Sequence, residues 1–161
     1  MMPLFLFRKR EKAAQKEKPK ELYIWEWGME YRIVEGKENI ELCDVVRLLR
    51  ITYWAEKRPA EVIERAMQNS ACFGIALEGS ETLAGFARVI TDHATTFYLC
   101  DVVVDPACRG RGLGKALLGH ILSRPEYMGL RGFLITRDAH GFYRPFGFET
   151  VNDRVMIRPP Q

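Results

Sequence analysis

The fold of this chain is decided by residues 104–115, which read Val104-Asp105-Pro106-Ala107-Cys108-Arg109-Gly110-Arg111-Gly112-Leu113-Gly114-Lys115. The proline ends an apolar strand, and the residues after the glycines repeat with helical spacing, at Gly114, Leu117, Leu118 and Ile121. Alternating glycines remove the Cβ atoms from the turn, so backbone N–H groups and the positive end of the helix are directed at one point. Arg109, Arg111 and Lys115 add full positive charges there. The segment therefore predicts a pyrophosphate-binding turn between a strand and a helix.

Two other glycine-rich phosphate motifs do not fit this segment. A Walker A loop needs Ser or Thr after its lysine, and here Ala116 follows Lys115. A Rossmann Gly-x-Gly-x-x-Gly motif that starts at Gly110 needs glycine where Lys115 stands, and it usually follows the first strand of a domain. The remaining alternative is a tight turn with incidental basic residues.

The strand before the turn, residues 97–104, is almost entirely apolar. This composition predicts a strand buried on both faces, at the centre of a sheet. A carboxylate at Asp101 is conspicuous there. Two interpretations stay open: Asp101 is a base or an amine-binding group, or it is a structural carboxylate that accepts hydrogen bonds from the backbone or from Arg88.

The rest of the chain supplies further strands and helices. Strands are predicted at residues 30–35, 72–77, 83–91, 132–136 and near 155–158, from apolar alternation and turn residues. A first helix is predicted after Asn39, its expected cap, with an apolar stripe of Leu42, Val45, Val46 and Leu49. A second helix is predicted to begin at Pro59, with an apolar side formed by Val62, Ile63, Ala66 and Met67. A third, short helix is predicted near residues 139–146. This order indicates the α/β (α+β) class, with one mixed sheet flanked by helices.

The distribution of charge and the cysteine content bear on the domain boundaries and on the presence of metal sites and disulfides. Residues 8–20 hold seven basic and two acidic side chains, a net of +5, whereas the whole chain carries +3. We therefore expect residues 1–28 to be a basic, solvated extension and residues 29–161 to be the domain, with a nucleic-acid contact as the less favoured interpretation. The four scattered cysteines predict neither a metal site nor disulfides. No apolar run approaches the roughly 20 residues of a membrane helix, so we expect a cytoplasmic protein without a membrane partner.

Two segments resemble one known superfamily. Arg109-Gly110-Arg111-Gly112-Leu113-Gly114 is similar to the acetyl-CoA signature of GNAT acetyltransferases, Arg/Gln-x-x-Gly-x-Gly/Ala, and residues 98–106 resemble the strand before it. Residues 138–148, with Tyr143-Arg144-Pro145-Phe146-Gly147-Phe148, resemble the Tyr-x-x-Phe-Gly-Phe segment of that family. The resemblance covers about residues 30–158. It implies a mixed, mostly antiparallel sheet whose central strand splays from the next one and leaves a slot.

The resemblance also implies acetyl-CoA as cosubstrate, with no metal. Its pyrophosphate would bind at Arg109, Gly110, Arg111, Gly112, Leu113, Gly114 and Lys115, and its pantetheine arm would pair with the backbone of Val102, Val103 and Val104. A primary amine, on a small molecule or a peptide, would then attack the thioester directly. The protein would position the two reactants and move protons.

For catalytic residues the resemblance points to Tyr143 as the general acid at the CoA sulfur. The alternative is that Tyr143 packs in an aromatic cluster with Phe142, Phe146 and Phe148. Asp101 is the candidate base or amine-binding carboxylate. Many members of the family carry an acid at the position of Cys100, so this chain departs there from a simple mechanism with a glutamate base. Weaker candidates for the acceptor pocket are Tyr53, Trp54 and His140, of which His140 could instead cap or pack the short helix.

These patterns lead to an N-acetyltransferase as the main hypothesis. The alternative is a catalytically degenerate domain that binds acetyl-CoA as a sensor. A third hypothesis, nucleic-acid binding through the basic extension, predicts salt-sensitive binding that needs residues 1–28. The acceptor amine and the oligomeric state, including a homodimer, stay open.

Overall fold

The computed structural model of this chain describes residues 22–24 and 30–159. Among these residues, one six-stranded sheet follows chain order: β1 (Leu22–Ile24), β2 (Glu30–Glu35), β3 (Ala71–Leu77), β4 (Gly85–Thr91), β5 (Thr96–Val104) and β6 (Arg131–Phe133). All neighbouring strands are antiparallel except β5 and β6, which are parallel. This mixed, mostly antiparallel sheet confirms the predicted fold class.

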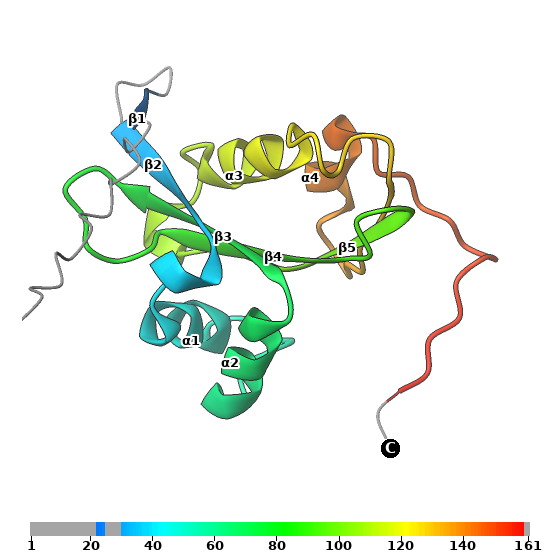
Figure 1. Cartoon of the computed structure of the whole chain (residues 1–161), viewed down its shortest axis with the longest axis horizontal. Helices are drawn as coiled ribbons and strands as arrows, with labels where there is room; N and C mark the ends of the chain where they lie inside the picture. The colour runs from blue at the N-terminus through cyan, green and yellow to red at the C-terminus, as the bar shows by residue number, and fades with distance from the viewer. Residues whose placement is uncertain (1–21, 25–29, 160–161) are drawn as a thin grey trace, which may run out of the picture.

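Helices cover both faces of the sheet (Figure 1). On one face lie α1 (Leu42–Arg50) and α2 (Ala60–Gln68), and on the other lie α3 (Leu113–Leu122) and the short α4 (His140–Tyr143). Three 3₁₀ turns, η1 (Lys37–Asn39), η2 (Pro106–Cys108) and η3 (Arg144–Phe146), join these elements. The layers give two cores, one around Leu48, Leu49 and Phe86 under α1 and α2, the other around Leu117, Leu118 and Ile121 of α3.

Strand β5 carries a bulge at Asp101, where φ is 54°. The register against β4 shifts there, because Phe86 pairs with Val103 whereas Arg88 pairs with Cys100. The inserted residue reverses the facing of the side chains that follow: Leu99 belongs to the α3 core, but Val103 belongs to the α1–α2 core. A buried non-glycine residue at positive φ is uncommon, so this bulge is a specific feature of the strand.

The other edge of β5 is open beyond its first residues. Strand β6 pairs with β5 only from Thr96 to Tyr98, whereas β5 continues to Val104. No other described strand pairs with that edge of β5. The splay predicted for the central strand is therefore present, and it exposes the backbone just before the glycine-rich turn.

Some predicted elements differ from the structure. Asn39 is not the cap of α1, because it lies in η1 and its side-chain amide donates to the Glu35 carbonyl (2.7 Å), while Glu41 precedes the helix. The strand predicted at 132–136 is shorter, ending at Phe133, and no strand forms at 155–158. Strand β1 precedes residue 29, the expected start of the domain, and the rest of residues 1–28 lies outside the described residues. None of the described helices has the length and apolar character needed to cross a bilayer.

Candidate active site

The glycine-rich turn has the backbone that its sequence predicts. Gly110 and Gly112 adopt φ values of 74° and 76°, a left-handed conformation that side chains with a Cβ disfavour. Gly112 is the N-cap of α3, so the amide N–H groups of the first helical turn have no acceptor within the helix. At Gly114, an added Cβ would lie 3.4 Å from the Phe142 ring and from Val104, so the helix packs closely on the end of β5. The turn thus presents unpaired donors at a fixed place beside the strand.

Side chains of the turn hold it against β5. The Asp105 carboxylate accepts a hydrogen bond from the Ala107 backbone N–H (3.0 Å) and another from Arg47 (2.7 Å). These contacts lower the pKa of Asp105, the backbone hydrogen bond most of all. Arg109 donates from Nε to the Val104 carbonyl (3.0 Å) and is otherwise exposed. Because Arg47 offsets the charge of Asp105, the turn keeps a net positive charge from Arg109, Arg111 and Lys115.

A cavity of about 580 Å³ opens where β5 splays from β6. Its lining includes the splayed end of β5, the glycine-rich turn, α4 and one aromatic residue of the α1–α2 connection: Trp54, Val102, Val103, Val104, Cys108, Arg109, Gly110, Gly112, Leu113, Gly114, Lys115, Ala139, Phe142 and Tyr143. The structure therefore brings together all the cofactor residues that the sequence predicted except Arg111, which is exposed on the same turn. The cavity combines an apolar strand end, backbone donors and positive charge. That combination fits a ligand with a pyrophosphate group and an extended arm.

The contacts of Tyr143 are compatible both with a general acid and with a residue of the aromatic core. Its ring packs against Phe142 (centroids 4.9 Å apart) and Phe148 (6.0 Å), as the packing alternative requires. It also lines the cavity. Among the described residues, none forms a hydrogen bond with the Tyr143 hydroxyl. Every fully buried side-chain oxygen in this part of the chain has a hydrogen-bond partner, so the Tyr143 hydroxyl is not fully buried and reaches solvent. Burial raises the pKa of Tyr143 to about 12, which keeps the phenol protonated at neutral pH.

Asp101 lies outside the cavity lining, within a cluster of arginines. Arg58 donates from Nη1 to both carboxylate oxygens (3.0 and 2.9 Å), and Arg88 donates from Nε to Oδ2 (2.9 Å). Arg88 also reaches the Ser70 hydroxyl (2.9 Å). The hydrogen bond from Arg88 is the one expected for a structural carboxylate. Both carboxylate oxygens are occupied by hydrogen bonds from guanidinium groups, so the contacts favour that interpretation over a catalytic base.

Cys100 is half-buried beside this cluster. Its thiol lies 3.5 Å from the Arg88 carbonyl, and burial raises its pKa to about 12. A neutral thiol cannot accept a proton from an ammonium group at pH 7. Cys100 therefore supplies no base.

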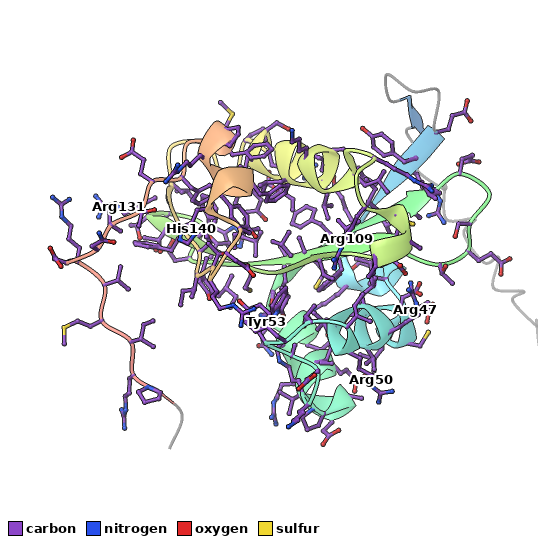
Figure 2. All side chains as sticks on the ribbon, turned by 180° about the vertical axis from the view of Figure 1, so that it is seen from behind. Arg47, Arg50, Tyr53, Arg109, Arg131 and His140 are labelled. Carbon is purple, nitrogen blue, oxygen red and sulfur yellow. The ribbon has the colours of Figure 1, made fainter. Side chains whose placement is uncertain are left out.

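The three weaker candidates are not all at the cavity. Trp54 lines it, whereas Tyr53 and His140 do not. The guanidinium of Arg137 stacks over the Tyr53 ring, 3.7 Å from the ring centroid. This cation–π contact joins the α1–α2 connection to the segment before α4. Figure 2 shows Tyr53 near the α1–α2 layer and His140 at α4. Their roles stay predictions.

Sequence reasoning missed several residues at the site. Cys108 and Ala139 line the cavity, and so does Phe142, which the aromatic cluster had suggested only as a core residue. Arg58 was also missed, since it contacts Asp101 across 43 residues of sequence and no local pattern links the two. Among the described residues, no group of three or more His, Cys, Asp or Glu side chains is placed so that it could hold a metal ion.

Comparisons with known proteins agree with this geometry. Residues 38–148 match the model of the Acetyltransferase (GNAT) family. An uncharacterized N-acetyltransferase, ycf52, from Gracilaria tenuistipitata var. liui is 30% identical over 121 residues, which are 72% of this chain and 66% of the relative. The chain thus spans less than two thirds of that relative, and the matched part covers 57% of histone acetyltransferase TAP1 from Glycine max.

Solved structures show the same fold. A GNAT-family acetyltransferase from Xanthomonas campestris pv. campestris is 36% identical, with a TM-score of 0.74 over 81% of this chain and 93% of that one. Glucosamine-6-phosphate N-acetyltransferase from Arabidopsis thaliana shares the fold at 19% identity, with a TM-score of 0.57 over 80% of this chain and 97% of that one. Together with the splayed strand and the glycine-rich turn, these matches place the chain in the GNAT acetyltransferase family, whose cosubstrate is acetyl-CoA.

Proposed function

We propose that this protein is an N-acetyltransferase that moves the acetyl group of acetyl-CoA directly to a primary amine. The observation that carries the proposal is the cavity at the splay, because it joins the glycine-rich turn, the open end of β5 and the Tyr143 side chain in one space. The turn would hold the pyrophosphate through backbone N–H groups, with Arg109 and Lys115 adding charge. Val102, Val103 and Val104 would pair with the amides of the extended arm.

In this proposal the protein positions the amine and the thioester and transfers protons. The amine forms a C–N bond to the acetyl carbon while the C–S bond breaks, and the thiolate that leaves needs a proton. Tyr143 is the proposed donor, because its phenol is protonated and its hydroxyl reaches solvent space at the cavity. The ammonium proton would leave to water, since the contacts of Asp101 and Cys100 make neither a ready acceptor.

The acceptor class stays wider than any one relative suggests. Both small-molecule amines and peptide amines are compatible with a slot whose lining includes Trp54. A cytoplasmic location is proposed only from the sequence, as is the absence of a nucleic-acid or membrane partner.

The proposal is tested by CoA release from acetyl-CoA with a panel of amines: polyamines, amino acids, aminoglycosides and peptide N-termini. We expect amine-dependent release, with acetylated product confirmed by mass spectrometry. Tight binding of acetyl-CoA without CoA release for any amine would favour the sensor alternative. The observation that supports this alternative is the pairing of Asp101 with Arg58 and Arg88, which leaves the site without an evident base. Absence of acetyl-CoA binding would contradict both functions.

A further inference from the structure

The arginine cluster around Asp101, formed with Arg58 and Arg88, carries one positive charge more than it neutralises. Both guanidinium groups pair with the same carboxylate, each at 2.9 Å. Among the described residues, no other carboxylate forms an ion pair with either arginine. The cluster is largely shielded from water, since the side chains are 25% exposed for Arg58, 12% for Arg88 and 5% for Asp101. A net charge of +1 in a half-buried place is unfavourable unless a counter-ion completes it.

Several N–H groups of these two arginines remain for a counter-ion. Arg58 uses only Nη1, which donates to both carboxylate oxygens, whereas Arg88 uses Nε toward Asp101 and Nη1 toward Ser70. The other nitrogens, Nε and Nη2 of Arg58 and Nη2 of Arg88, donate to none of the described residues. Every fully buried side-chain nitrogen in this part of the chain has a partner, so these three nitrogens reach solvent. A planar guanidinium group with unused N–H groups is the usual binding partner of an oxyanion.

The arginine cluster lies beside the cavity at the splay. Asp101 directly precedes Val102, the first residue of β5 in the cavity lining, and successive strand residues rise by about 3.3 Å. Arg58 follows Trp54, the lining residue of the α1–α2 connection, by one short stretch of that connection. Two separate segments therefore hold the cluster next to the space in which the thioester and the amine would meet.

Tyr98 is a common neighbour of the cluster and of the proposed acid. It is the last residue of β5 that pairs with β6, so the splay opens at this position. Burial raises the pKa of Tyr98 first of all, and the charges of the arginine cluster change it further. The Tyr98 phenol is in turn one of the groups that, after burial, raise the pKa of Tyr143. The cluster and Tyr143 therefore both lie near Tyr98, where β5 leaves β6.

The charge of the cluster indicates which anion it would bind. One carboxylate would bring the net charge from +1 to zero, whereas a phosphate monoester, with a charge of about −1.5 to −2 at pH 7, would leave an excess of negative charge. We propose that the acceptor is an amine that also carries a carboxylate, and that the solvent-facing N–H groups of Arg58 and Arg88 bind this carboxylate. The identification of the ligand as the acceptor rests on the proposed function.

The test compares matched pairs of amines in amine-dependent CoA release. β-Alanine, γ-aminobutyrate, ε-aminocaproate and L-alanine are paired with propylamine, butylamine, hexylamine and isopropylamine, in which a methyl group replaces the carboxylate. For at least one pair, kcat/KM per neutral amine should be about tenfold to a hundredfold higher with the carboxylate, the effect of one hydrogen bond between charged groups. The ratio within a pair is the measured quantity, because it cancels any general change in activity.

Arg58→Gln identifies the group that binds the carboxylate. It should bring the ratio within the preferred pair close to one, whereas a merely structural role would lower both members and keep the ratio. Arg58→Lys keeps the charge beside Asp101 without the planar fork, so it should recover part of the ratio. The matched control is Arg65→Gln, at an exposed arginine of α2, which should keep the full ratio. Thermal melts check that each variant is folded.

The failure of the carboxylate site and the failure of the proposed function give different results. CoA release with a ratio near one in every pair would overturn the site alone, as would a ratio that survives Arg58→Gln. A larger ratio for phosphoethanolamine over ethanolamine would overturn the choice of a carboxylate. No CoA release with any amine would contradict the proposed function. Calorimetric titration of the same pairs into the CoA-saturated protein then tests the site: binding of the carboxylate member alone is expected, and equal or absent binding would overturn it.

Discussion

The two halves of the candidate site are built in different ways. The cofactor half is a continuous segment, residues 102–115, which supplies ten of the residues that line the cavity, three of them glycines. The acceptor half joins distant segments, since Trp54 comes from the α1–α2 connection and Tyr143 from α4. Backbone sites are therefore encoded locally by glycine and proline, whereas sites made of side chains depend on how distant segments pack.

The largest expected effect is in the cofactor half. Gly112→Val places a branched side chain at φ 76° beside the phosphate position. Loss of two backbone hydrogen bonds to a charged group, each worth about 1.5–3 kcal/mol, should weaken acetyl-CoA binding by at least a factor of about a hundred. Calorimetric titration with acetyl-CoA measures this loss of affinity.

Gly129→Val is the matched control for that change. Gly129 has φ 83° and lies in a loop where an added Cβ meets nothing within 4 Å, so it has the same backbone strain without the cavity. It should lower the melting temperature without changing acetyl-CoA affinity. Equal affinities in both variants would show that the turn does not hold the cosubstrate.

The next effect is on stability, and it comes from the arginine cluster around Asp101, which lies outside the cavity. Asp101→Asn removes the charge that pairs with Arg58 and Arg88. Breaking a buried pair costs about 3–5 kcal/mol, and we expect the lower end, about 3 kcal/mol, because the Arg58 side chain is 25% exposed. Denaturant unfolding measures this loss.

The pH profile of the same variant separates the two interpretations of Asp101. A structural carboxylate leaves the shape of the turnover profile unchanged in Asp101→Asn. If Asp101 instead removed the proton from the amine, the defect would ease at high pH, where the amine is already neutral. That easing would contradict the structural assignment.

The smallest expected effect concerns Trp54, which lines the cavity from the α1–α2 connection. Trp54→Ala should raise the KM for the acceptor amine by about tenfold or less, the effect of losing about 1 kcal/mol of aromatic contact. Acetyl-CoA affinity should change little. An equal loss of acetyl-CoA affinity would assign Trp54 to the cofactor half.

The same contrast explains what the sequence could predict. The turn at residues 104–115 follows from local glycine, proline and apolar patterns, whereas the splay of the central strand was implied only by the family resemblance; both are present. Arg58 on Asp101 and the stacking of Arg137 on Tyr53 depend on tertiary packing, so no local pattern indicated them. The bulge at Asp101 also escaped prediction, because an uninterrupted apolar strand predicts uniform alternation. The strand at 155–158 failed for another reason: a strand needs a neighbour, which its own sequence does not encode.

Turnover by Tyr143→Phe tests the central claim most directly. The change removes one hydroxyl and keeps the ring against Phe148, so acetyl-CoA affinity and stability should change little. Turnover should fall about a hundredfold, within the usual contribution of general acid catalysis. Because the pKa of Tyr143 is raised to about 12, the acid form persists throughout pH 6 to 9, and the unchanged protein should show no loss of turnover toward pH 9. Full turnover by Tyr143→Phe across that range would contradict the acid assignment and return Tyr143 to the aromatic core.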